Sequence, residues 1–96
     1  MNIDELLHEK HEEILRIAAR HGAYNVRVFG SAVRGEAGLE SDVDFLAEVG
    51  LGRSAWFPAG LVLDLEELLG CKVDVVTEQA LHWYIRDRVL KEAVPL

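Results

Sequence analysis

The chain has 96 residues, of which 50% are hydrophobic and 28% are charged. This balance excludes an intrinsically disordered protein, and the length predicts one domain, residues 1–96, with a single modest core. The formal net charge of −7 argues against long DNA or RNA as a partner, because phosphate binding needs a basic surface. A small anionic substrate neutralised by metal ions, or a partner protein with a basic surface, stays open.

The sequence also predicts neither a membrane protein nor a secreted one. It contains no apolar run long enough to span a bilayer. The first ten residues, MNIDELLHEK, carry acids where a secretory signal needs positive charge. The single cysteine, Cys71, cannot form an internal disulfide, which is usual in a reducing compartment. We therefore expect a cytoplasmic protein.

The first half of the chain predicts one helix followed by two strands. Apolar residues recur at helical spacing over residues 3–21, and Gly22 is suited to end that helix. Alternating apolar residues predict strands over residues 24–29 and 42–49. The segment between them, residues 32–40, contains two glycines and is expected to form a turn and a loop.

The second half predicts two helices around a third strand. A helix over residues 58–69 begins at a proline, which suits a first helical turn, and a strand follows over residues 72–77. A last helix is expected over residues 79–92, with Trp83 and Tyr84 packing into the core. The order helix, strand, strand, helix, strand, helix predicts an α/β (α+β) fold, a small mixed sheet with helices packed on one face.

Three acidic residues stand inside the predicted strands. Asp42 and Asp44 are one position apart, so a strand would point both to the same face, and Asp74 lies between two valines. Bare carboxylates at that spacing repel one another, and a hard divalent cation such as Mg²⁺ removes the repulsion. If the third strand pairs beside the second, the three acids converge, as in sites that hold two metal ions for phosphoryl chemistry.

The pair Gly30-Ser31 follows the first predicted strand directly. Glycine lets the backbone approach a ligand closely, and exposed N–H groups at the start of a helical turn suit a phosphate. Ser31 then adds a hydroxyl donor, although it could serve only as a helix cap. For Arg34, a phosphate contact and an ion pair with Glu36 both remain open.

The stretch GSAVRGEAGLESDVDFL, residues 30–46, resembles the signature of the DNA polymerase β-type nucleotidyltransferase superfamily. In it, ten residues separate the Gly30-Ser31 pair from the sequence Asp42-Val43-Asp44. The version with Arg34-Gly35-Glu36 and Ser41 is similar to the minimal nucleotidyltransferases, or MNT proteins. Prokaryotes commonly encode these beside a HEPN-domain protein, as the antitoxin of a toxin–antitoxin pair. The resemblance covers nearly the whole chain.

This resemblance implies a role for each matching residue. The Gly30-Ser31 pair matches the contact to the nucleotide phosphates, and Arg34 is a further candidate for it. Asp42 and Asp44 match the metal ligands. Asp74 matches the third carboxylate, which helps to bind the catalytic metal and to activate the acceptor hydroxyl. The implied cofactor is Mg²⁺, two ions, and the implied substrate is ATP.

The reaction implied by the resemblance is transfer of a nucleoside monophosphate, AMP from ATP, to a hydroxyl with release of pyrophosphate. In MNT antitoxins the acceptor is a tyrosine of the HEPN toxin, whose RNase activity is thereby silenced. A chain of this length leaves no room for a second substrate-binding domain, so we expect the acceptor on a partner or on a self-assembled surface. Two alternatives stay open: a catalytically idle antitoxin that acts by binding its toxin, and nucleotidylation of a small hydroxyl compound. The sequence leaves open the preferred base and whether the chain forms a homo- or hetero-oligomer.

Overall fold

The computed structural model describes residues 3–30, 42–50 and 57–96. Within these residues the chain forms, in order, α1 (Ile3–Glu9), α2 (His11–Arg20), β1 (Ala23–Phe29), β2 (Val43–Val49), α3 (Ala59–Leu69), β3 (Val73–Thr77), the 3₁₀ helix η2 (Glu78–Ala80), α4 (Trp83–Glu92) and β4 (Val94–Pro95). The expected order of elements is therefore present. It is modified by a break in the first helix and by the addition of η2 and β4.

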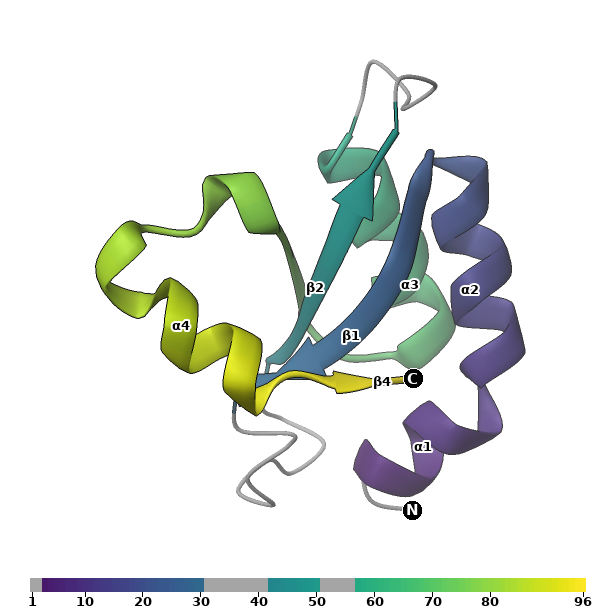
Figure 1. Ribbon diagram of the computed structural model, residues 1–96. Coiled ribbons are helices and arrows are strands. Elements are labelled where there is room, and N and C mark those ends of the chain that lie inside the picture. Colours follow the sequence, from purple (N-terminus) through teal and green to yellow (C-terminus); the bar gives the residue numbers. More distant parts are fainter. Residues whose placement is uncertain (1–2, 31–41, 51–56) are drawn as a thin grey trace.

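The strands of the described residues form one mixed sheet with the order β3-β2-β1-β4 (Figure 1). β1 runs antiparallel to β2, whereas β3 runs parallel to β2, because α3 carries the chain back before β3 begins. The short strand β4 pairs with Arg27 and Val28 of β1. The predicted mixed α/β sheet is confirmed, and its parallel pair places β3 at one edge.

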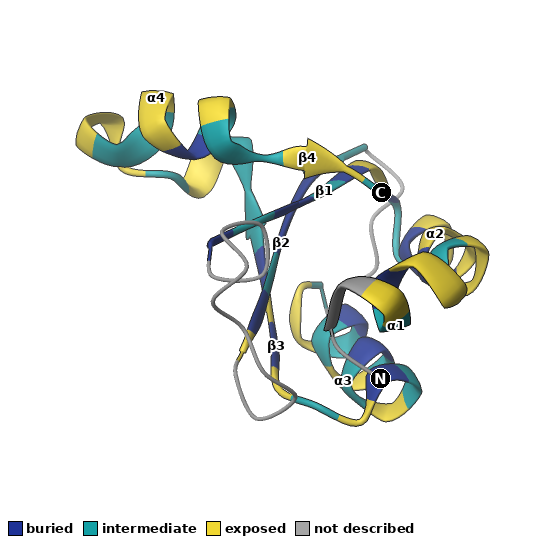
Figure 2. Cartoon of the chain, turned by 90° about the horizontal axis from the view of Figure 1, so that it is seen from below, coloured by how far each residue is buried: buried dark blue, intermediate teal, exposed yellow. Residues whose placement is uncertain are grey.

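The core lies between the sheet and the helices α1, α2 and α3, which cover one face of it (Figure 2). The two longer of these helices turn an apolar stripe toward the strands, and the strands contribute every second residue. His21 Nε2 donates a hydrogen bond of 2.7 Å to Asp64 Oδ2, which joins the end of α2 to α3. The core residues are Leu7, Ile14, Ile17, Ala18, Ala23, Val26, Val28, Val43, Phe45, Ala47, Leu61, Leu65, Leu69, Val73 and Val75.

The single helix expected over residues 3–21 is divided at Lys10, which forms a turn between α1 and α2. Hydrogen bonds still cross this turn, from the Lys10 N–H to the Leu6 carbonyl oxygen and from the Ile14 N–H to the Lys10 carbonyl oxygen. All six residues between the buried Leu7 and Ile14 are polar and none of them is buried. This part of the chain is therefore not packed against the core, which allows the helix to break at Lys10.

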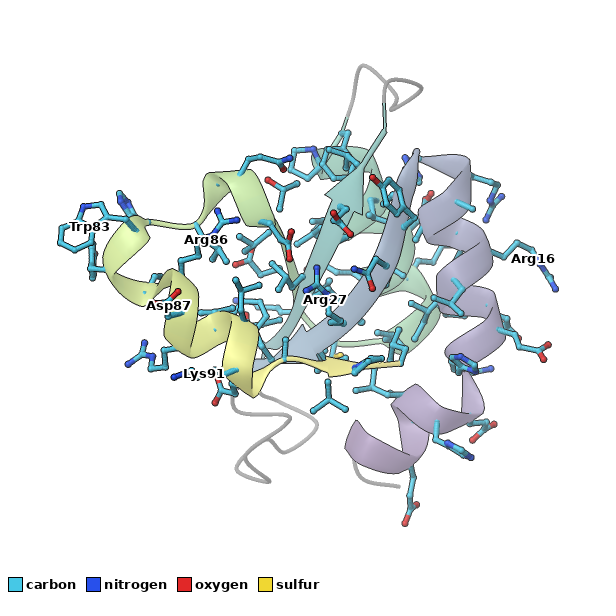
Figure 3. The ribbon with its side chains drawn as sticks, viewed as in Figure 1. Arg16, Arg27, Trp83, Arg86, Asp87 and Lys91 are labelled. Atoms are coloured by element: carbon cyan, nitrogen blue, oxygen red, sulfur yellow. The ribbon has the colours of Figure 1, made fainter. Side chains whose placement is uncertain are left out.

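The last helix also differs from the expectation, because α4 begins at Trp83 and lies across the sheet from α2 and α3 (Figures 1 and 2). The prediction that Trp83 and Tyr84 pack into the core is wrong, since they are 85% and 67% exposed (Figure 3). The buried residue of α4 is Val89, near its other end. The first turn of the helix extends past the strands, so its aromatic rings face solvent.

On the face of the sheet opposite α2 and α3, a partly buried ion pair connects β1 to the segment before α4. Arg27 Nη1 lies 3.0 Å from Glu78 Oε1, and the two side chains are only 12% and 22% exposed. The Arg86 guanidinium donates a hydrogen bond of 3.0 Å to the Glu78 carbonyl oxygen. Leu46, the register partner of Arg27, is completely buried on this side of β2.

Of the helices in the described ranges, none has the length and apolar character that crossing a membrane requires.

Two leucines of α3 provide a test of this packing. Leu65 is 1% exposed, whereas Leu63 on the same helix is 65% exposed. We expect Leu65→Ala to lower the free energy of unfolding by about 3 kcal/mol, because it removes buried methyl groups and leaves a cavity. Leu63→Ala should change it by less than about 0.5 kcal/mol. Urea unfolding followed by circular dichroism measures both, and equal losses would contradict this assignment of the core.

Candidate active site

The centre of the candidate site is a pair of carboxylates on β2 and β3. In the parallel register, Asp44 lies directly beside Asp74. The flanking residues of both strands are buried in the core, so the two aspartates belong to the opposite face of the sheet. Neighbouring strands lie about 4.8 Å apart, which keeps the two side chains close. The pairing of the second and third strands, on which the predicted acid cluster depends, is therefore present.

Asp42 lies just outside β2, although the sequence predicted it as the first strand residue. The next residue, Val43, donates a backbone hydrogen bond of 2.9 Å to the Lys72 carbonyl oxygen, so this end of β2 adjoins the start of β3. Burial raises the pKa of the nearby Cys71 thiol, and the negative charges of Glu66 and Asp42 raise that pKa further. The Asp42 carboxylate thus lies close enough to Cys71 to affect its pKa, at the edge of the sheet where β2 and β3 begin.

The described residues contain no group of three His, Cys, Asp or Glu side chains that could hold a metal ion. Asp42, Asp44 and Asp74 are all described and do not form such a group as they stand, so their convergence around two metal ions stays a prediction. The chemistry of the donors nevertheless fits Mg²⁺, because Asp44 and Asp74 present carboxylate oxygens from adjacent strands.

Gly30 lies against Asp44, directly after the end of β1. Its predecessor Phe29 is the register partner of Asp44. Gly30 is buried and has a φ of +78°, a conformation that L side chains rarely adopt. A Cβ atom added to it would overlap with Asp44 Oδ2. The absence of a side chain thus lets the Asp44 carboxylate lie directly against the Gly30 backbone, so a ligand that reaches one of the two groups also lies close to the other.

A further carboxylate, which the sequence reasoning missed, reaches this position from α4. The Gly30 N–H donates a hydrogen bond to Glu92 Oε2 at 3.3 Å. Glu92 is the last residue of its helix, where the negative end of the helix dipole disfavours an acid. That mismatch is the only sequence signal that could have drawn attention to it.

Two other predicted site residues, Ser31 and Arg34, lie outside the described residues. The phosphate contacts expected of Ser31 and Arg34 stay predictions. Of the predicted site residues that the structure describes, Asp44 lies beside Asp74 and against Gly30, which follows β1, and Asp42 lies one residue before β2.

Comparison with known proteins shows which group of enzymes uses this arrangement. The model of the nucleotidyltransferase domain family matches residues 9–96. The chain belongs to this family. It is a nucleotidyltransferase, as the glycine–serine pair and the spaced aspartates predicted.

Two relatives are small members of this nucleotidyltransferase family. MJ0435 of Methanocaldococcus jannaschii, assigned as a protein adenylyltransferase, is 40% identical over 94 residues, which are 98% of this chain and 97% of the relative. The protein adenylyltransferase MntA of Thermococcus cleftensis is 42% identical over 84 residues, 88% of this chain and 83% of the relative. The nucleotidyltransferase is therefore similar to protein adenylyltransferases over most of its length.

Two solved structures share the fold of this nucleotidyltransferase. One, described as a minimal nucleotidyltransferase, has a TM-score of 0.86 and 48% identity, and the match covers 100% of this chain and 97% of that one. A toxin–antitoxin structure with AMP-PNP has a TM-score of 0.73 and 17% identity, with coverage of 88% and 69%, and this likeness concerns the fold alone. The predicted resemblance to minimal nucleotidyltransferases is confirmed.

A comparison of Gly30 with Gly70, whose backbone has a similar φ, can distinguish an effect on the site from an effect on stability. Gly30 and Gly70 have φ values of +78° and +71°, but a Cβ at Gly70 would meet nothing within 4 Å. Replacing either by alanine should lower the free energy of unfolding by about 1 kcal/mol, because both sites favour the left-handed conformation. Only Gly30→Ala should also weaken ATP binding, since its Cβ displaces Asp44. Thermal melts and calorimetric titration measure the two effects, and equal ATP binding by both variants would exclude this role for Gly30.

Proposed function

We propose that this nucleotidyltransferase transfers AMP from ATP to a hydroxyl group of a partner protein, and that it is the antitoxin of a HEPN-type toxin. The observation that carries the proposal is the pair Asp44 and Asp74, side by side on parallel strands, with the Asp44 carboxylate directly against the backbone of Gly30. Carboxylates that face a phosphate-binding backbone are suited to nucleotidyl transfer with a divalent metal.

In this proposal Asp44, Asp74 and Asp42 would hold Mg²⁺, two ions, which would supply positive charge to offset the negative charge of the triphosphate. The residues of the chain position the substrates. The N–H groups of the Gly30-Ser31 pair hold phosphate oxygens, and Arg34 contributes a further phosphate contact. Asp42 precedes β2, so the alternation of side chains between the two faces of the sheet does not fix its direction. Its side chain can therefore turn toward the other two acids.

Asp74 is suited to act on the acceptor because it is exposed, whereas Asp44 is half-buried. Its carboxylate takes the proton of the acceptor hydroxyl. The hydroxyl oxygen then forms a bond to the α-phosphorus of ATP, the bond from that phosphorus to the bridging oxygen breaks, and pyrophosphate leaves. An exposed base at the edge strand β3 can be reached by a hydroxyl that arrives on another molecule.

The choice of a protein acceptor rests on the relatives, which are named as protein adenylyltransferases. We propose that residues 1–96 form a single minimal nucleotidyltransferase domain and that the acceptor is presented by the docked partner. A cytoplasmic location accords with a substrate pool of ATP and with a free thiol at Cys71.

Charge-neutral substitutions of the aspartates test the proposal. Asp44→Asn and Asp74→Asn should each reduce transfer of labelled AMP to the partner by about 100-fold or more, because they remove charges that act on the transition state. Their melting temperatures, measured alongside, should stay close to that of the wild type, because asparagine keeps the shape of aspartate. Asp87→Asn, an exposed position of α4, is the matched control (Figure 3).

The measurement uses purified protein, labelled ATP, Mg²⁺ and the partner encoded by the neighbouring gene, with and without EDTA. Full transfer by Asp44→Asn would refute the proposal. Absent transfer by the wild type, together with protection of cells by an Asp44/Asp74 double variant, would favour an antitoxin that acts by binding alone. Transfer to a small hydroxyl compound in the absence of any partner would point to the other alternative.

A further inference from the structure

The carboxylate of Glu92 is built into the candidate site. It accepts the hydrogen bond of the Gly30 N–H at 3.3 Å. Three residues earlier, Val89 is buried at 4% exposure, and its carbonyl oxygen accepts a hydrogen bond of 2.9 Å from the Ala93 N–H. Two residues later, Val94 pairs with Val28 of β1. The backbone on either side of Glu92 is thus fixed to the sheet.

The ion pair between Arg27 and Glu78 holds the chain to β1 just before α4 begins. Glu78 binds Arg27 of β1 through its side chain and Arg86 of α4 through its carbonyl oxygen. α4 is therefore tied to β1 before and after its own length, and Glu92 returns to the end of that same strand. The fold of the backbone therefore brings the Glu92 side chain to Gly30.

The contact places an anion where a phosphate is expected. A carboxylate oxygen and a phosphate oxygen accept hydrogen bonds from a backbone N–H in the same manner. The Asp44 carboxylate already lies against Gly30, so a phosphate using this N–H would meet two negative groups. At 3.3 Å the bond to Glu92 is longer than the usual 2.7–2.9 Å of a charge-assisted bond, and a phosphate can replace it.

We propose that Glu92 is an affinity-determining residue of the nucleotide site, which occupies the Gly30 N–H in the free protein and gives it up to a nucleotide phosphate. This inference rests on the proposed function, in which Gly30 binds phosphate. Glu92 weakens ATP binding by competing for the donor and by repelling the phosphate. The same effect favours the departure of pyrophosphate after transfer.

The test is the dissociation constant for ATP with Mg²⁺, measured by calorimetric titration of the full chain without an acceptor. Glu92→Gln removes the charge and keeps an acceptor oxygen, and we expect it to bind ATP about tenfold more tightly than the wild type. Asp87→Asn removes the same charge from an exposed position of the same helix and should stay within twofold. Repeating both titrations in 0.5 M KCl separates local competition from long-range repulsion, since only the latter is screened.

A second readout follows the Gly30 amide directly by ¹⁵N–¹H NMR. In the free protein, Glu92→Ala should move this resonance upfield, because the carboxylate no longer accepts its hydrogen bond. In the wild type, ATP with Mg²⁺ should move the same resonance to the position that it takes in nucleotide-bound Glu92→Ala.

Two results would overturn the inference, and they are distinguishable. If Glu92→Gln binds ATP as the wild type does or more weakly, while Gly30→Ala loses binding, Glu92 is not a competitor and the proposed function stands. If the folded wild type binds no ATP with Mg²⁺, the proposed function fails and the inference fails with it.

Discussion

Two negative charges at matching positions of adjacent parallel strands are the constraint on which this site depends. Asp44 and Asp74 repel each other, and the core on the other face of the sheet holds them in place. A slip of one residue between β2 and β3 would turn buried residues such as Phe45 toward solvent and an aspartate toward the core, at a cost of several kcal/mol. The hydrophobic face thus enforces a charge arrangement that the acids alone would avoid.

The two faces of the sheet therefore have different tasks. One face is covered by α1, α2 and α3 and supplies the stability of the domain. The other carries the acids, the shielded pair Arg27–Glu78 and the final helix. Because α4 crosses to this second face and returns to β1 through β4, the chain brings a residue from its last helix to Gly30 at the end of its first strand.

Much of this could be predicted from the sequence, because the decisive signals are local. Alternation revealed the strands, Gly22 adopts the positive φ expected at the end of a helix, and the spacing of Asp42 and Asp44 indicated the chemistry. The misjudged features depend on contacts between distant residues. Helical spacing cannot show that Trp83 extends past the sheet, and nothing near Glu92 in the sequence indicates that it meets Gly30.

The parallel pairing of β2 with β3 also determines when the site can exist. Its two aspartates are separated by the whole of α3, so no fragment of the chain that lacks the crossover contains the pair. During synthesis the glycine emerges first, the second acid follows some forty residues later, and Glu92 arrives near the end. The two carboxylates are thus brought side by side only when the crossover is complete, so the order of synthesis places assembly of this pair late in folding.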